Sequence, residues 1–184
     1  MIRLARGDAE GAQSDAARVV ELVRPIQDPQ RRLTALPIAA FVFFSAEDEK
    51  RAEEVLDEAL GHLRQLRQLG SAGITLHHLA WVARALGREA DVLEVIERDP
   101  FKSRWLEVAR AVALGEFAEA ADLLTRIGNV SDEAFYRLRA AEQLVAEDRR
   151  AEADEQLGRA LAFYRNVRAT RYVREGEALL AATA

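Results

Sequence analysis

The histidines are the first residues to consider, because they are the side chains most often used for metal binding and proton transfer near neutral pH. The chain has three of them: His62, His77 and His78. Neighbouring residues on a helix point about 100° apart, whereas two metal ligands on one helix need a spacing of three or four residues. Because His77 and His78 are adjacent, we predict no metal site; we expect one histidine near a groove and one at a helix-packing surface.

Acidic residues occur in groups that resemble general acid–base carboxylates: Glu53–Glu54, Asp57–Glu58, and Glu152 with Asp154–Glu155. A catalytic carboxyl group needs partial burial to raise its pKa, and each of these lies opposite an apolar stripe, so we expect solvated faces. The sequence has no cysteine, no glycine-rich phosphate loop and no Gly-x-Ser-x-Gly nucleophile motif. We therefore predict a non-enzyme with no catalytic residue and no cofactor.

Better functional candidates lie on the first helices of two successive predicted hairpins: His77, Trp81, Arg84, Lys102 and Trp105. The first three follow at i, i+4 and i+7, which places them on one stripe of a helix. Tryptophan and arginine are residue types that often anchor protein interfaces. We expect these residues to bind a partner; the alternative is that the two tryptophans belong to the hairpin core.

The composition is that of a folded chain with a mildly acidic balance. Of its 184 residues, 49% are hydrophobic and 31% are charged, and the formal net charge is −5. With arginines interleaved among acids, this balance disfavours nucleic acid or anionic membrane as a partner. The longest apolar run, 36–44, is far shorter than the about 20 residues of a membrane-spanning helix, and no signal-peptide core follows the first residues. We expect a cytoplasmic protein.

Helical periodicity runs through almost the whole chain, without the alternation of a β-strand. The clearest stripe, in 52–63, has apolar residues at steps of three and four, and a similar one recurs in 153–164. We expect helices over residues 1–6, 10–23, 29–44, 48–68, 74–86, 89–98, 102–114, 117–127, 132–147, 150–166 and 171–182.

Local signals predict how these helices begin and bend. Ser131 should cap one helix, and Ser45 with Asp48 resembles a capping box for another. Pro37 should kink the helix that contains it, and residues 70–73 should form a flexible joint.

Small or apolar residues recur at the predicted seams between helices: Ala12, Ala52, Val92, Ala120 and Ala153. This recurrence predicts an all-α chain of antiparallel helical hairpins, with 1–184 as a single domain. We expect about five hairpins, with the first truncated and the helix over 171–182 as a C-terminal cap. Residues 1–6 are too short to cover the helix over 10–23, and its uncovered apolar face predicts a possible homo-oligomer.

The turn and helix over 114–120, with the sequence LGEFAEA, resemble the tetratricopeptide repeat, and residues 148–165 are similar. The seam intervals are uneven, unlike the even repeat of about 34 residues in that family. The resemblance implies a right-handed superhelical array, a tetratricopeptide-like α-α solenoid whose first helices line a concave face.

The segments 162–165 (AFYR), 169–172 (ATRY) and 175–180 (EGEALL) resemble the end of the repeat region in large bacterial regulators with AAA-type or signal-transduction ATPase modules. In that tail a glycine stands where this chain has Arg168. The resemblance implies a non-enzymatic protein–protein interaction or scaffold module, the partner-binding or sensing arm of a signalling or transcriptional regulator, with a protein or peptide segment on its concave face. The alternative is a regulatory domain that senses a small molecule in the concave groove.

Overall fold

A computed structural model describes residues 1–182 of the chain. Its described part is all-α, without strands. None of the helices found there combines the length and the apolar character that crossing a membrane requires. The elements are α1 (Ile2–Ala5), α2 (Ala9–Val23), α3 (Pro29–Ser45), α4 (Glu49–Gln65), the 3₁₀ helix η1 (Gly70–Thr75), α5 (Leu76–Ala85), α6 (Glu89–Arg98), α7 (Arg104–Leu114), α8 (Phe117–Ile127), α9 (Val130–Ala146), α10 (Arg150–Asn166) and α11 (Thr170–Ala182).

The helices form two compact units. Unit 1 consists of Met1 and Asp8–Gly115, and therefore contains α2 to α7. Unit 2 consists of Ile2–Gly7 and of the chain from Glu116 onward, and therefore contains α1 and α8 to α11. The interpretation of residues 1–184 as a single domain stays a prediction.

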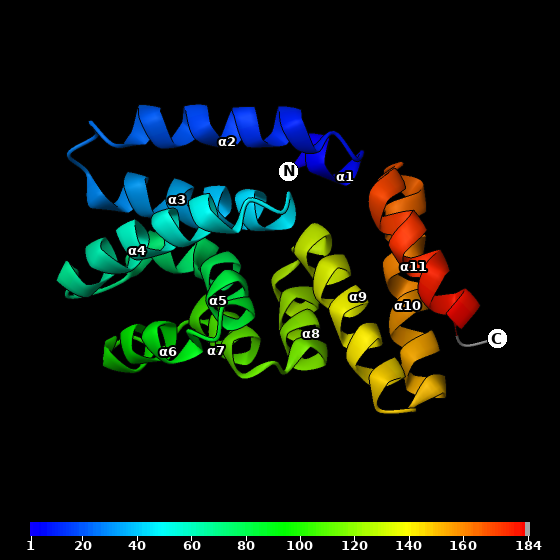
Figure 1. Cartoon of the computed structure of the whole chain (residues 1–184). Helices are drawn as coiled ribbons and strands as arrows, with labels where there is room; N and C mark the ends of the chain where they lie inside the picture. The colour runs from blue at the N-terminus through cyan, green and yellow to red at the C-terminus, as the bar shows by residue number, and fades with distance from the viewer. Residues whose placement is uncertain (183–184) are drawn as a thin grey trace. The chain divides into compact units, whose positions relative to one another are not determined.

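In unit 1 each helix packs on its neighbours in chain order, and α5 also packs on both α3 and α7 (Figure 1). The expected seam residues of this unit are buried: Ala12 is 2% exposed, and Ala52 and Val92 are fully covered. Small side chains at these positions let two helix backbones approach closely. The same holds in unit 2, where Ala120 and Ala153 are buried.

The apolar face of α2 is covered, contrary to our expectation. Ala12, Ala16, Val20 and Val23 are buried, and α2 lies along α3 over much of its length (Figure 1). The sequence argument failed because it looked for cover only in the preceding helix, whereas the following one provides it.

Side-chain caps begin several helices, at positions that partly differ from those expected. Asp48 itself caps α4 by accepting a hydrogen bond from the Arg51 amide, while Ser45 is the last residue of α3. Asn129 caps α9 by accepting from the Asp132 amide, and Ser131 donates to the Asn129 side chain. The bonds that Asp48 and Asn129 accept each satisfy a backbone amide that has no partner within the first helical turn.

The expected joint at 70–73 is a 3₁₀ helix that is bound on several sides. The Gln30 side chain accepts hydrogen bonds from the Ser71 hydroxyl and the Ala72 amide. Thr75 donates to the Leu33 carbonyl, and buried Asp99 accepts from the Leu69 amide at 2.6 Å. These partners lie far away in sequence, so local composition alone could not reveal them.

Pro37 was expected to kink the helix that contains it. Helix α3 continues through this proline as one element.

Unit 2 contains a buried arginine that joins three helices. Arg137 of α9 is 1% exposed and donates to Glu133 on its own helix at 2.7 Å, to Gln156 of α10 at 2.7 Å and to Asp122 of α8 at 3.0 Å. A fourth bond, of 3.1 Å, reaches the Thr125 hydroxyl. A buried guanidinium is tolerated when its donors are satisfied in this way.

Tyrosines fill the other part of this unit. The rings of Tyr164 and Tyr172 stack with centroids 4.7 Å apart, and Phe135 meets Tyr172 edge-on. Burial raises the pKa of Tyr172 to about 12 and raises the pKa values of Tyr136 and Tyr164 above the ordinary value as well. These phenols therefore stay neutral at physiological pH.

Candidate interaction surface

The predicted partner-binding residues lie on α5, on α7 and in the segment between α6 and α7, all in unit 1. Helix α5 packs between α3 and α7, so its side chains face two neighbours. A residue of α5 at a step of four or seven from another can therefore point to a helix instead of to solvent.

The two adjacent histidines belong to a line of rings across three helices. Phe41 of α3 meets His78 edge-on at 5.2 Å, and His78 lies 4.0 Å from His77 between ring centroids. His77 in turn stacks on Trp105 of α7, with centroids 6.1 Å apart and planes at 15°. His77 is 1% exposed, so its expected place on an accessible stripe is corrected: it belongs to the packing between α5 and α7.

Arg84 stabilises the end of α7. Its Nη1 donates to the Ala113 carbonyl at 3.1 Å, and its guanidinium lies against Gly115, which has φ +80°. The last carbonyls of a helix lack intrahelical partners and carry partial negative charge, so a cation there is favourable. The half-buried Arg84 thus has a structural role that sequence spacing did not reveal.

The remaining three candidates keep accessible surface. Trp81 and Trp105 are half-buried, and Lys102 is exposed just before α7. Of the five predicted residues, the structure brings His77 and Trp105 into ring contact and places Arg84 on the end of α7. Partner binding by Trp81, Lys102 and Trp105 stays a prediction.

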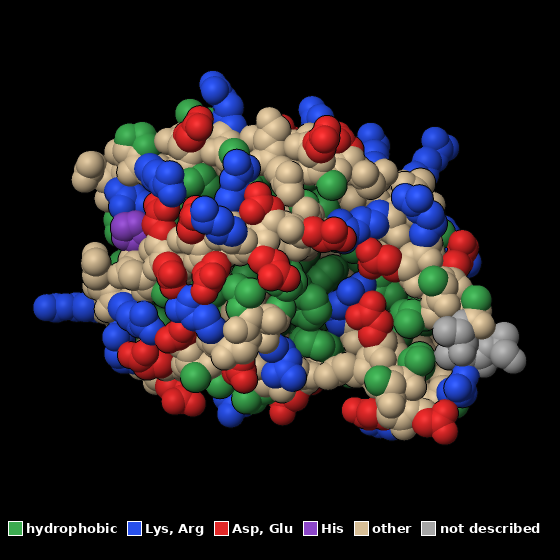
Figure 2. Space-filling view, in the orientation of Figure 1, with side chains coloured by type: hydrophobic (Ala, Val, Ile, Leu, Met, Phe, Trp, Pro, Cys, Tyr) green, Lys and Arg blue, Asp and Glu red, His purple; other side chains and the backbone are tan. Residues whose placement is uncertain are grey.

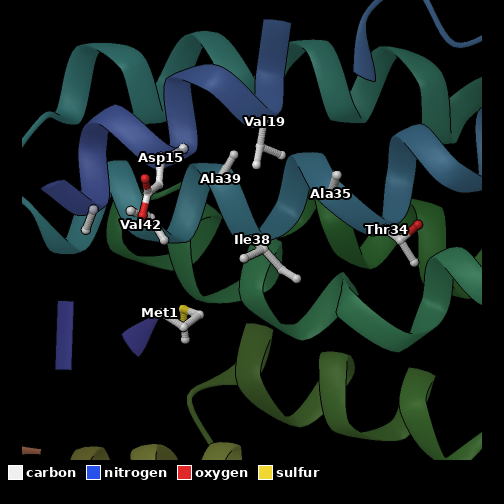
Figure 3. A pocket seen from close by; sticks show the side chains of 10 residues that line it. Met1, Asp15, Val19, Thr34, Ala35, Ile38, Ala39 and Val42 are labelled. Carbon is white, nitrogen blue, oxygen red and sulfur yellow. The ribbon is translucent and has the colours of Figure 1, made fainter. Parts of the chain in front are cut away.

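A hollow between α2 and α3 was not predicted. It has a cavity volume of about 320 Å³ and is lined mainly by small and aliphatic side chains, including Ala16, Val19, Ala35 and Ile38, with Met1 also contributing. In Figure 3, Val19 and Ile38 point into the same space from the two helices. Val19 is 38% exposed, so this apolar surface is open to solvent.

Two polar residues lie at the rim of the hollow. Asp15 lies toward one end and Thr34 toward the other (Figure 3). The Thr34 hydroxyl donates to the backbone carbonyls of Gln30 and Arg31, so its proton is already used within α3. The apolar run in α3 could have indicated this hollow. A helix that is apolar on all sides needs other elements to cover more than one of its faces.

Ion pairs on the outside of unit 1 join α2, α4 and α6. Arg24 pairs with Glu58 at 2.8 Å, Arg64 with Asp91 at 2.7 Å, and Arg88 with Asp57 at 2.7 Å. Partial burial acts to raise the pKa of Asp91, but hydrogen bonds from Arg88 and Arg64 outweigh it and lower that pKa. These charged side chains therefore pair with one another on the surface of unit 1.

Acidic and basic side chains alternate over the surface seen in Figure 2, and neither sign forms one large patch there. The acids of the expected solvated faces, such as Glu53, Glu54 and Glu155, are exposed. No family model matches the sequence, and the searches of curated proteins and of solved structures also found no match.

Proposed function

We propose that this chain is a non-enzymatic protein–protein interaction or scaffold module, in which helical hairpins form a right-handed superhelical array of the tetratricopeptide kind. Support comes from the buried seam residues Ala12, Ala52 and Val92, and from the packing of α5 on both α3 and α7. Helical arrays of this kind offer extended surfaces to peptides and helices.

The observation that carries the proposal is the open apolar hollow between α2 and α3. Val19 and Ile38 present aliphatic surface there, and the hollow has room for a side chain from a partner. Exposed apolar surface next to polar residues is typical of protein interaction sites. The partner we propose is a protein segment that inserts a large apolar side chain into this hollow.

A second candidate function is the sensing of a small molecule. The hollow, at about 320 Å³, lies at the lower end of the range for ligand pockets, which is about 300–1,000 Å³, and it has polar groups at its rim. Its open side favours a protein segment, because small-molecule pockets enclose most of their ligand.

The resemblance of residues 162–180 to the tail of bacterial regulators supports a more specific role. In this role the chain is the partner-binding or sensing arm of a cytoplasmic signalling or transcriptional regulator. Trp81, Lys102 and Trp105 are a further contact surface in this proposal, on the helices expected to line the concave face.

Photo-crosslinking in the source organism tests the proposal. A benzophenone amino acid at Ile38 should capture one defined protein, whereas the same group at exposed Glu94 of α6 should not. Adding Val19→Glu should abolish capture at Ile38 without changing the melting temperature, because Val19 is already 38% exposed. Equal capture at both positions would contradict the proposal. The second candidate would be favoured if native mass spectra showed a bound metabolite that Val19→Glu displaces.

Alanine substitutions on α5 separate its structural role from its binding role. Arg84→Ala should lower the melting temperature, because Arg84 binds the end of α7. If Trp81 contacts the partner, Trp81→Ala should weaken capture more than its effect on melting explains.

A further inference from the structure

An aromatic ring is exposed where the segments 66–75 and 99–104 of unit 1 meet. All aromatic residues of the chain lie in the part that the structure describes, and among them Phe101 alone is exposed, at 60%. The buried Asp99 carboxylate accepts hydrogen bonds from the Phe101 amide at 2.8 Å and from the Leu69 amide at 2.6 Å. These bonds hold the two segments side by side, so the exposure of Phe101 does not come from a loose loop.

Ile74 adds a second exposed apolar side chain at the same end of the unit. It is 41% exposed. Its 3₁₀ helix η1 packs on α7, and a Cβ on the neighbouring Gly73 would lie 3.2 Å from the Leu106 side chain, in the first turn of α7. Phe101 comes shortly before this turn in the chain. Exposed apolar surface that is bordered by polar residues is typical of interaction sites.

Three cations of these segments have no acidic partner. Arg67, Lys102 and Arg104 are exposed and form no ion pair with any residue that the structure describes. The acid between them in space, Asp99, is buried, and both of its oxygens already accept backbone hydrogen bonds. Positive charge is therefore left unpaired here, in a chain whose formal net charge is −5.

We call the exposed residues of this end the loop patch: Arg67, Ile74, Phe101, Lys102 and Arg104. We propose that the loop patch binds a short acidic segment of another protein, which places an apolar side chain on Phe101 and Ile74. Charge complementarity selects this occupant, because the carboxylates of the segment supply the partners that the three cations lack within the chain. The exposed ring and the aliphatic side chain fix where its apolar residue lies.

The surroundings of the loop patch favour a short segment over an extended polyanion. The exposed acids Glu97 and Glu107 border the patch along the chain. At physiological salt, charges farther apart than about 8 Å are largely screened, so a short acidic segment interacts mainly with the local cations. A nucleic acid or an anionic membrane would extend over the acids as well and would be repelled by them.

This inference rests on the proposed interaction function and adds a partner class to it, because Lys102 belongs to the further contact surface named there. The two can fail separately. Capture at Ile38 tests the hollow between α2 and α3 and does not involve the loop patch. Conversely, Val19→Glu changes the hollow and should leave binding at the loop patch unchanged.

Fluorescence anisotropy of the purified full chain with a short labelled peptide is the test. The peptide carries aspartates and glutamates around a central leucine. We expect reversible binding that weakens as salt is added, because exposed charges are screened. The double substitution Lys102→Glu with Arg104→Glu should weaken binding about tenfold, since attractive pairs become repulsive. Phe101→Ala should also weaken binding without changing the melting temperature, because the ring is already exposed.

Matched controls separate the loop patch from the general surface. Lys50→Glu changes the only other lysine of the chain, which is exposed on α4, and should leave binding unchanged. Leu22→Ala removes another exposed apolar side chain of unit 1 and should also have no effect. A peptide with lysines in place of the acids should not bind. Absence of binding by the acidic peptide, equal weakening by Lys50→Glu, or loss of binding in Val19→Glu would each overturn the proposal.

Further measurements on the same variants decide between occupants. We expect a single-stranded oligonucleotide and phosphatidylglycerol vesicles to bind more weakly than the acidic peptide. Tighter binding of either one, lost on the double substitution of Lys102 and Arg104, would assign the loop patch to nucleic acid or membrane and overturn the proposal. A salt-sensitive dimer of the chain alone, lost on the same double substitution, would assign the patch to a second copy and overturn it as well.

Discussion

Two arginines, one in each unit, make similar sets of bonds in different surroundings. Arg88 of unit 1 reaches Asp57 of α4 and Asp91 of α6, and 27% of its side chain is exposed. Arg137 of unit 2 reaches Asp122, Glu133 and Gln156 and is 1% exposed. Water can replace the partners of the first arginine but not those of the second. Arginine therefore forms surface ion pairs in unit 1, whereas in unit 2 it links three helices from the interior.

The units also differ in their aromatic residues, which gives each unit its own signal. Both tryptophans of the chain, Trp81 and Trp105, belong to unit 1. All three tyrosines, Tyr136, Tyr164 and Tyr172, belong to unit 2. Tryptophan fluorescence thus reports unfolding of unit 1, and tyrosine absorbance reports unfolding of unit 2.

The largest expected effect comes from removing the buried arginine. Arg137→Ala removes four hydrogen bonds from the interior and leaves a cavity, although Glu133 keeps its ion pair with Arg159, so it should lower the free energy of unfolding of unit 2 by about 3 kcal/mol. Urea unfolding followed by tyrosine absorbance measures this. Arg88→Ala is the matched control and should cost less than about 1 kcal/mol, read by tryptophan fluorescence. If both substitutions lowered the free energy of unfolding equally, the two arginines would not differ as proposed.

Alkaline pH should destabilise unit 2 selectively. Unfolded tyrosine ionises near its ordinary pKa of 10.0, whereas burial raises the pKa of folded Tyr172 to about 12. Above pH 10 the unfolded state therefore loses protons that the folded state keeps. The stability supplied by neutral Tyr172 is complete below pH 10 and is lost as the pH rises toward 12, by up to about 3 kcal/mol.

A pH titration of phenolate absorbance measures this loss. Ionisation should be delayed beyond pH 10 and should then coincide with unfolding of unit 2. A smooth titration centred at pH 10 in a chain that stays folded would contradict the assignment of these tyrosines to a closed interior.

The end of α7 should be sensitive to an added methyl group. Gly115 has φ +80°, and a Cβ there would lie 2.5 Å from the Arg84 guanidinium, so Gly115→Ala should lower the stability of unit 1 by about 1–2 kcal/mol. Gly61→Ala is the control within the same unit. Its Cβ would meet nothing within 4 Å inside a regular helix, so it should raise stability by up to about 1 kcal/mol. Urea unfolding followed by tryptophan fluorescence should therefore show changes in the free energy of unfolding that have opposite signs in the two variants.

The smallest effect concerns the turn before α11. Arg168 has φ 56°, the left-handed conformation that glycine adopts without strain. Arg168→Gly should therefore stabilise unit 2 by less than about 1 kcal/mol, since the relief of strain exceeds the entropy that glycine gains on unfolding. A lower tyrosine-detected stability in this variant would show that the Arg168 side chain makes a compensating contribution.

The sequence predicted the helices and the seams because both depend on local pattern. Helix α8 covers the expected residues 117–127, and α10 covers 150–166. Caps were harder to place where two capping residues stand close together, as Asn129 and Ser131 do. Both side chains can accept a backbone hydrogen bond, and only the relation to the first turn decides which of them caps α9.

The interaction surface was predicted less well because it depends on long-range contacts. The spacing of His77 and Arg84 correctly predicted that both lie on one helix. It could not reveal that both side chains contact α7. Arg137 did leave a signal, since it interrupts the apolar stripe of Ala134, Leu138 and Ala141. An arginine in such a position indicates a buried polar network, although not its partners.

Helix α1 belongs to unit 2, where it packs against α11, while the intervening α2 to α7 form the other unit. The Thr170 hydroxyl donates to the Arg6 carbonyl across 164 positions of the chain. During synthesis α1 therefore leaves the ribosome before α2 to α11, and it meets α11 only after the helices between them have been synthesised. Until then Leu4, which is fully covered in the finished fold, stays open to chaperones and to neighbouring nascent chains.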